Sequence, residues 1–283
     1  YLTQQGILKK SSLDRYSTRF NIDHKATKWL DLGLKATVGY SKTNFADPEA
    51  GAGRQNWGNP WFTTLLAYPY ESPDDWYNVD NPTLITKYYD RETGRLKTVA
   101  SVYAKASITD WLSVKTNFGL DFMYNRNVST LHRDHPNAQQ NHGYYGQTSS
   151  ELFRYTWTNT INVNKDFANG HSLNAVAGME MFQGKWYTSN FTGYDLNSDM
   201  MQSPAGIGDK SGSSLFPPSI GGGRTMSNLM SFFAQASYSI ANKYNFSASL
   251  RHDTSSKFYE DNASATFWSV GASWLISSES WFD

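Results

Sequence analysis

The strictest pattern in this sequence is a two-residue alternation of apolar and polar side chains between Leu96 and Asn125. In its first arm the apolar side is formed by Leu96, Thr98, Ala100, Val102, Ala104, Ala106 and Ile108. A second arm, Leu112–Asn125, repeats the alternation and predicts a second extended strand with one apolar face. Both arms exceed the ~9–11 residues that a tilted strand needs to cross a bilayer, whereas strands of soluble proteins usually have about 5–6. The stretch is therefore predicted to be one hairpin of a transmembrane β-barrel.

The same alternation predicts strands on both sides of this hairpin, over residues 13–24, 30–40, 151–163, 172–181, 232–240, 244–251 and 268–276. Short turns are expected near residues 26, 110, 168 and 242, and long loops over Asn44–Arg95, Asn127–Gln147 and Thr192–Thr225. Barrels of outer membranes alternate short periplasmic turns with long outer loops, whereas Greek-key sandwiches mix their connections. The predicted fold is all-β: about nine antiparallel strands of a large transmembrane barrel with long extracellular loops.

Trp29 and Trp111 each follow a tight turn and precede a strand. An indole at this position is typical of the aromatic girdle at the edge of the hydrocarbon layer. The alternative is that both are core residues of a soluble sheet.

The amino-acid composition excludes some classes of protein but does not separate a membrane barrel from a secreted all-β protein. The chain has 25 basic and 25 acidic side chains, which argues against a nucleic-acid binder. It has no cysteine, which excludes a disulfide scaffold and thiolate-based metal or catalytic sites. A secreted all-β lectin would have similar composition. Because the chain begins at Tyr1 and ends at Asp283 without a signal peptide, residues 1–283 are expected to be an interior piece of a longer polypeptide.

Two stretches resemble a known family. Residues 251–258, RHDTSSKF, and 267–277, FWSVGASWLIS, resemble the R-x-D-x-S-S-[RK]-F … S-V-G-A-S-W-x-I-S signature of the SusC/RagA family, TonB-linked outer-membrane proteins of the Bacteroidota. Residues 6–9, GILK, and 15–24, RYSTRFNIDH, look like early barrel strands of that family. This chain departs from the family at two positions: it has His252 and Thr254 where Arg or Asp and Gly are commoner in the family.

The resemblance implies a 22-stranded barrel of a TonB-dependent transporter in the outer membrane of a Gram-negative, Bacteroidota-like bacterium. It also implies an N-terminal plug, a contact with TonB–ExbB–ExbD, a SusD-like surface lipoprotein as lid, and import of oligosaccharides or oligopeptides. The plug, the TonB box and the last strands are not recognisable in this chain. About nine strands cannot close such a barrel, and open edges in lipid leave backbone groups unpaired, so this piece is not expected to insert alone.

Two groups of residues are candidates for contact with cargo. Aromatic side chains of the first long loop could stack on sugar rings or pack on peptide side chains, namely Trp57, Trp61, Trp76 and Tyr77. The alternative is that they form the loop's own core or the lid contact. Charged side chains on the polar faces are expected to line the lumen and to contact the plug or the solute, namely Arg19, Lys35, Lys105, Lys115, Asp121, Arg154 and Glu180. Their mixed signs favour a neutral or zwitterionic cargo.

No catalytic constellation is recognised, so the protein is expected not to be an enzyme and to carry no cofactor. His132, Asp134, His135 and His142 could bind zinc or copper, but no helix fixes them. Residues 195–199 resemble the start of a calcium loop, yet Met200 and Gly206 replace its essential Gly and Glu, so no metal is assigned. Two rival functions stay open: a siderophore or vitamin receptor without a lid, and a secreted β-sandwich carbohydrate-binding protein.

Overall fold

The computed structural model describes residues 1–44, 82–135, 138, 141–198, 203–208, 217–259 and 262–282. Its strands are β1 Leu2–Gln5, β2 Ser12–Lys25, β3 Leu30–Asn44, β4 Tyr89–Ser107, β5 Leu112–Leu131, β6 Tyr144–Phe167, β7 His171–Tyr194, β8 Ser219–Ile240, β9 Tyr244–Ser255 and β10 Ser264–Trp274. Helical segments are α2 Pro82–Tyr88 and the short 3₁₀ turns η3 Ala168–Gly170, η4 Pro204–Gly206 and η7 Ile276–Ser278. Among the described residues, no helix is long and apolar enough to cross a membrane.

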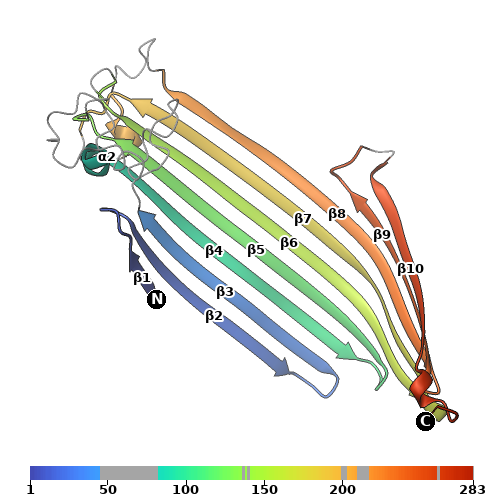
Figure 1. The fold of residues 1–283 in the computed structure, drawn as a ribbon. Helices are drawn as coiled ribbons and strands as arrows, with labels where there is room; N and C mark the ends of the chain where they lie inside the picture. The colour runs from blue at the N-terminus through green and yellow to red at the C-terminus, as the bar shows by residue number, and fades with distance from the viewer. Residues whose placement is uncertain are drawn as a thin grey trace.

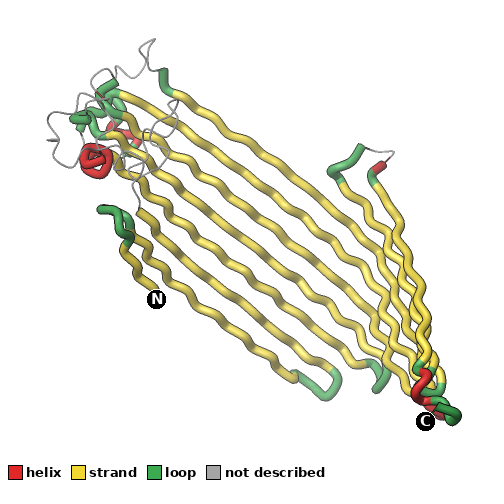
Figure 2. Tube along the Cα trace, viewed as in Figure 1, coloured by secondary structure: helices red, strands yellow, loops and turns green. Residues whose placement is uncertain are grey.

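All ten strands lie in one antiparallel sheet whose spatial order is the chain order, β1 to β10. Figures 1 and 2 show a single curved layer, in which the short turns that join β2 to β3, β4 to β5, β6 to β7 and β8 to β9 all lie at the same end of the strands, and the longer connections start from the opposite end. We call these the short-turn end and the long-loop end. A β-sandwich needs two packed sheets, so the β-sandwich alternative is wrong.

Register assigns every strand residue to one of two faces, because directly opposed residues of antiparallel strands share a face. The polar face consists of the odd positions of β2–β5 and β8–β10 and the even positions of β6 and β7; the other positions form the apolar face. One level of the apolar face shows the pattern across seven strands: Ile22, Leu34, Val102, Phe118, Trp157, Met181 and Met230. The predicted alternation is therefore continuous across the sheet.

Aromatic side chains border the apolar face at both ends. Toward the long-loop end, one register level contains Tyr16, Tyr40, Tyr124 and Tyr187. At the short-turn end Tyr244 and Trp274 face each other on the apolar face, and the ring of Trp111 lies beside it, 4.8 Å from the ammonium of Lys165. Between them, large apolar side chains stay uncovered: Ile22 is 54 % exposed and Phe118 45 %. Such a surface is costly in water and requires another covering medium.

The described residues bury few hydrophobic side chains, and all of them lie at the long-loop end. These are Tyr89, Ala138, Tyr145 and Leu196. Leu196 pairs with Ile207 in an isolated bridge, and Ile207 packs against the backbone of Gly193. The sheet is thus held by its backbone ladders, and a small conventional core forms only where the loops fold over its end.

The short turns use one repeated motif. In Thr27-Lys28-Trp29-Leu30 the Thr27 hydroxyl oxygen accepts hydrogen bonds from the backbone N–H groups of Trp29 and Leu30, at 3.3 and 3.0 Å. Thr109 does the same for Trp111 and Leu112, at 3.4 and 3.0 Å. These local bonds satisfy turn donors that the ladder leaves unpaired. Each turn thereby fixes the backbone of its Trp directly before the next strand begins.

The structure differs from the sequence prediction at the long-loop end. It adds a tenth strand, β1, and the strands beside the loops run further than their apolar alternation: β5 reaches Leu131 and β4 begins at Tyr89. Backbone pairing continues there without an apolar face, and alternation alone does not detect it. Gly221–Gly223, predicted to lie in a flexible loop, are part of β8. A Cβ at Gly222 would lie 2.7 Å from the Thr188 carbonyl oxygen, so glycine permits this close approach.

Candidate functional site

The structure places all seven predicted charged residues on the polar face. They occupy four levels of the register: Arg19 with Asp121 and Arg154, Lys35, Glu180, and Lys105 with Lys115. A hydrogen-bonded ladder fixes each position to within one strand spacing of its neighbours, about 4.8 Å. The polar face is therefore one continuous wall of charged and hydroxyl-bearing side chains.

Contacts among these residues differ along the strands. Arg154 Nη1 lies 4.0 Å from Asp121 Oδ2, and Arg19 Nε donates to Thr37 Oγ1 at 3.4 Å. Closer to the short-turn end, Arg251 contacts Glu180 at 3.6 Å and Asp253 at 2.7 Å. The predicted pair Lys105 and Lys115 face each other directly. The Lys115 ammonium lies 4.9 Å from the ring centroid of Tyr103, which lessens the repulsion between the two lysines.

Two glycines on this wall are covered by aromatic rings from the neighbouring strand. The ring of Tyr103 lies over Gly33, and its hydroxyl donates to Asp23 Oδ1 at 2.7 Å. The ring of Phe233 similarly lies over Gly178, its register partner. This pairing of an aromatic residue with a cross-strand glycine fills the space left by the missing side chain and fixes the register.

A hollow of about 640 Å³ opens on the polar face, in the half nearer the long-loop end. The residues that define it are Met123, Leu152, Arg154, Trp186, Thr225 and Lys257. Trp186 shares a level with Met123 and Leu152, and its side chain is 50 % exposed. We did not expect Trp186 from the sequence. The available signal is an indole at an even position of β7, where the alternation calls for a polar residue.

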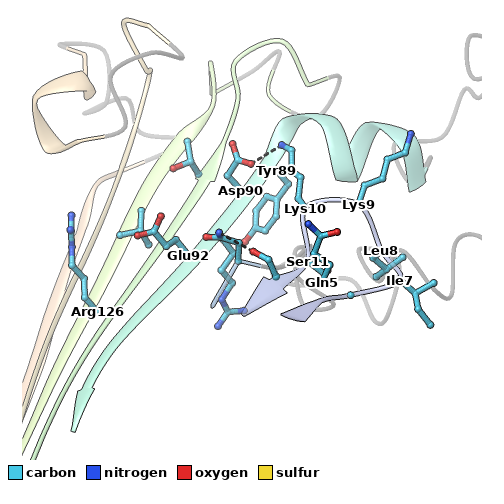
Figure 3. A pocket seen from close by; sticks show the side chains of 16 residues that line it. Gln5, Ile7, Leu8, Lys9, Lys10, Ser11, Tyr89, Asp90, Glu92 and Arg126 are labelled. Atoms are coloured by element: carbon cyan, nitrogen blue, oxygen red, sulfur yellow. Dashed lines mark hydrogen bonds and ion pairs between the residues drawn. The ribbon is translucent and has the colours of Figure 1, made fainter. Parts of the chain in front are cut away.

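A second cavity, of about 810 Å³, lies at the rim of the long-loop end between the β1–β2 connection and β4 (Figure 3). There the Lys10 ammonium lies 2.6 Å from Asp90 Oδ1, and His132 Nε2 lies 2.7 Å from Asp90 Oδ2. The hydrogen bond with His132, followed by that from Lys10, lowers the pKa of Asp90 to about 2. Asp90 belongs to the apolar-face positions of β4, so this cluster joins three segments of chain on the side away from the predicted wall.

The loop histidines do not converge. His132 pairs with Asp90, whereas His142 Nδ1 lies 2.8 Å from Asp195 Oδ1. His135 is buried, which lowers its pKa. Among the described residues, no group of three or more His, Asp or Glu side chains could hold a metal ion.

The predicted loop aromatics Trp57, Trp61, Trp76 and Tyr77 lie outside the described residues. Three other aromatics form a row across the polar face at the long-loop end: Tyr89, Tyr144 and Tyr194, with successive ring centroids 6.3 Å apart. The Tyr144 hydroxyl donates to the Tyr89 hydroxyl at 3.2 Å. Tyr89 is buried, so this row is chiefly structural.

The fold has solved counterparts. The chain superposes on the RagAB peptide transporter with a TM-score of 0.79 at 20 % identity, covering 94 % of this chain and 30 % of that one. The RagAB peptide importer in its closed-closed state gives 0.78 at 19 % identity, covering 97 % and 31 %. BauA, the ferric preacinetobactin receptor from Acinetobacter baumannii, gives 0.52 at 12 % identity, covering 95 % and 38 %.

Sequence relatives agree. TonB-dependent receptor P39 of Formosa agariphila is 22 % identical over 99 % of this chain and 26 % of its own length. TonB-dependent receptor P3 of the same organism is 26 % identical over 99 % and 28 %. The chain therefore spans little more than a quarter of the length of these relatives. The profile described as TonB dependent receptor-like, beta-barrel matches residues 39–281. The chain belongs to this family, the β-barrel of TonB-dependent receptors in the outer membrane of Gram-negative bacteria.

Proposed function

We propose that the intact protein is an active importer of oligosaccharides or oligopeptides, of which residues 1–283 form an interior part of the barrel wall. It works with a SusD-like surface lipoprotein as lid and takes its energy from TonB–ExbB–ExbD through a part of the protein outside this chain. The observation that carries the proposal is the two-faced sheet itself, with a bordered apolar face behind a charged wall.

The apolar face has the height of a hydrocarbon layer. From Leu30 to Tyr40 on β3 there are ten steps of about 3.3 Å, which at the ~40° tilt of barrel strands span about 25 Å along the membrane normal. The apolar face thus contacts lipid, and the aromatic borders lie at the two interfaces. The polar face lines the lumen, with Arg19, Lys35 and the other predicted charges directed at plug or cargo.

Among the described strands, β10 and the part of β2 that extends beyond β1, residues 16–25, each have one edge without a strand partner. Unpaired backbone groups are not tolerated in lipid, so both edges pair with further strands of the barrel. Similarity to the RagAB structures supports both a barrel of this type and a lipoprotein lid.

Spin labels test the orientation of the faces. In the intact protein in liposomes, labels at Leu34→Cys and Phe118→Cys are expected to be relaxed by lipid-soluble oxygen. Labels on the adjacent positions, Lys35→Cys and Asn117→Cys, are expected to respond to a water-soluble nickel chelate instead. The reverse pattern would contradict the proposed orientation.

Uptake tests the activity. A strain that lacks the full-length gene should lose growth on one oligosaccharide or oligopeptide of a panel, and the gene should restore it only together with that of a SusD-like lipoprotein. Unchanged growth on the whole panel would contradict the proposal.

A lid-free siderophore or vitamin receptor is the second candidate, favoured by the similarity to BauA. It predicts that the intact protein purifies without a lipoprotein and that deletion impairs growth only under iron or vitamin limitation. Copurification of a surface lipoprotein would decide against it.

A further inference from the structure

The charges on the polar face are distributed unevenly along the strands. We divide the face at the level of Lys35 and Ser101 and count this level with the short-turn half. The short-turn half has five cations and five carboxylates: Lys25, Lys35, Lys105, Lys115 and Arg251 against Asp23, Asp31, Asp166, Glu180 and Asp253. The long-loop half has six cations and one carboxylate: Arg15, Arg19, Arg91, Arg95, Lys97 and Arg154 against Asp121.

This distribution changes the expectation for the cargo. In the short-turn half the carboxylates neutralise cations, as in the contacts of Arg251 with Glu180 and Asp253. At the described strand positions of the long-loop half the single carboxylate, Asp121, is in contact with Arg154, so cations outnumber carboxylates on this part of the wall. A concave wall with an excess of one charge sign concentrates ligands of the opposite sign. Equal numbers of cations and carboxylates, the pattern expected for a neutral cargo, are therefore confined to the short-turn half.

The long-loop half also contains the hollow with the half-exposed indole of Trp186. An exposed aromatic face is a stacking surface for the apolar face of a ring. Around it, Asn125, Ser150, Thr225 and Ser227 supply hydroxyl and amide groups that both donate and accept hydrogen bonds. Arg154 of β6 also lines the hollow, and guanidinium groups bind carboxylate or sulfate in a bidentate manner.

We propose that the long-loop half of the polar face binds acidic oligosaccharides, with a pyranose ring on Trp186 and its carboxylate or sulfate groups on Arg95 and Lys97, beside the Arg154–Asp121 pair. This deepens the proposed function and rests on it. Trp186 on β7 and Lys97 on β4 are three strand spacings apart, about 14 Å. A single sugar cannot bridge that distance, so the site selects an oligomer.

An acidic peptide would match the charges but not the surface. Extended peptides commonly bind by adding a strand to an open sheet edge, and β5 to β8 are each paired on both sides. The hollow is lined by hydroxyl and amide groups as well as by Met123 and Leu152, and it offers an indole on an open wall. The chemistry of the wall thus favours sugar rings over peptide side chains.

The experiment uses the purified full-length protein with its surface lipoprotein. Binding of a galacturonate hexamer, its carboxyl-reduced neutral form and a glutamate hexapeptide is measured by calorimetry at low and high salt. We expect the galacturonate hexamer to bind about tenfold more tightly than either competitor at low salt and to lose most of this advantage at high salt.

Variants locate the site. The double variant Arg95→Gln, Lys97→Gln should weaken binding of the acidic hexamer about tenfold and leave the neutral form unaffected, whereas Trp186→Ala should weaken both. The matched control is Lys42→Gln, Arg126→Gln, which removes two cations from nearby levels of the opposite face and should change neither.

Equal affinity for the acidic and neutral hexamers would overturn the proposal and show that other parts of the full-length protein neutralise these cations. Preference for the glutamate peptide would overturn it as well. In both cases uptake of the preferred oligomer by living cells would leave the proposed importer standing. If living cells took up none of the three oligomers through this protein, that result would instead contradict the proposed function.

Discussion

The two ends of this sheet are built in different ways. At the short-turn end, Thr27 and Thr109 organise their hairpins through bonds to residues two and three positions away. At the long-loop end, Asp90 joins Lys10 and His132, which lie 80 and 42 positions away, and His142 joins Asp195 over 53 positions. Local contacts repeat wherever their motif repeats, whereas distant contacts depend on the whole fold. The turns at Thr27 and Thr109 are therefore repeated local units, whereas the long-loop end, like the contacts of Lys243 and Tyr244 with Glu279 at the last short turn, depends on the whole fold.

The largest expected effect tests how tightly the two ends are packed. At Gly178, in the short-turn half, a Cβ would lie 2.5 Å from the Asn159 carbonyl oxygen and 2.8 Å from the Phe233 ring. Because a backbone atom cannot move aside, Gly178→Ala should lower the free energy of unfolding by about 2 kcal/mol. Urea unfolding of the intact protein in liposomes measures it.

Its matched control is Gly146→Ala, on the same face of the long-loop half. There a Cβ would meet only the hydroxyls of Ser129 and Thr192, at 3.1 and 3.3 Å. Both side chains can rotate, so the change should stay within about 0.5 kcal/mol. Equal destabilisation by the two substitutions would remove the contrast in packing.

The next effect concerns the distant contacts. Asp90→Asn removes the ion pair with Lys10 and weakens the contact with His132. Because both ion pairs are partly exposed, the loss should be about 1 kcal/mol, concentrated on the β1–β2 connection. Trypsin should then cleave after Lys9 or Lys10 faster than in the parent protein, with cleavage elsewhere unchanged. Unchanged cleavage would mean that the connection is held by other contacts.

The same cluster sets a pH dependence. The pKa of Asp90 is lowered from its ordinary 3.8 to about 2, so its stabilising contribution is fully present above about pH 4 and is lost as the pH falls toward 2. Hydrogen exchange of residues 6–11, corrected for the intrinsic rate, should stay constant from pH 7 to 4 and accelerate below. In Asp90→Asn this step should be absent.

The smallest effect tests the repeated turn. Thr109→Val removes the acceptor of two backbone N–H groups at a solvent-accessible turn, which should lower the free energy of unfolding by up to about 1 kcal/mol. Thr27→Val should cost the same within about 0.5 kcal/mol, since the two turns share their bonds. Urea unfolding measures both, and unequal losses would show that the turns are not equivalent.

The sequence was sufficient for the parts with local or periodic causes. Alternation predicted the strands β2 to β10, because one apolar face produces a two-residue period. Trp29 and Trp111 directly follow tight turns, as predicted, and their place in an aromatic girdle stays a prediction. β1 was missed because its four residues, Leu2–Gln5, have no such period. The outer parts of β4 to β8 were missed because their pairing lies beyond the apolar face.

The sequence could predict which residues belong to the candidate site, but not how they are grouped on the polar face. Each of the seven charges could be assigned to a polar face from its own strand, and register places them together. Which half of the face carries excess charge depends on the relative stagger of neighbouring strands, which the alternation does not contain. Trp186 was overlooked for the opposite reason: a large aromatic at a polar position is an exception to the pattern that located its neighbours.

Every strand of this sheet bonds only to the strands next to it in the chain. A hairpin together with its outer loop is thus a self-contained module, exchangeable for another of equal stagger without re-pairing the rest. Recombination among ancestral genes would therefore diversify recognition at the cell surface while the membrane-spanning part of the sheet and the short turns stay as they are.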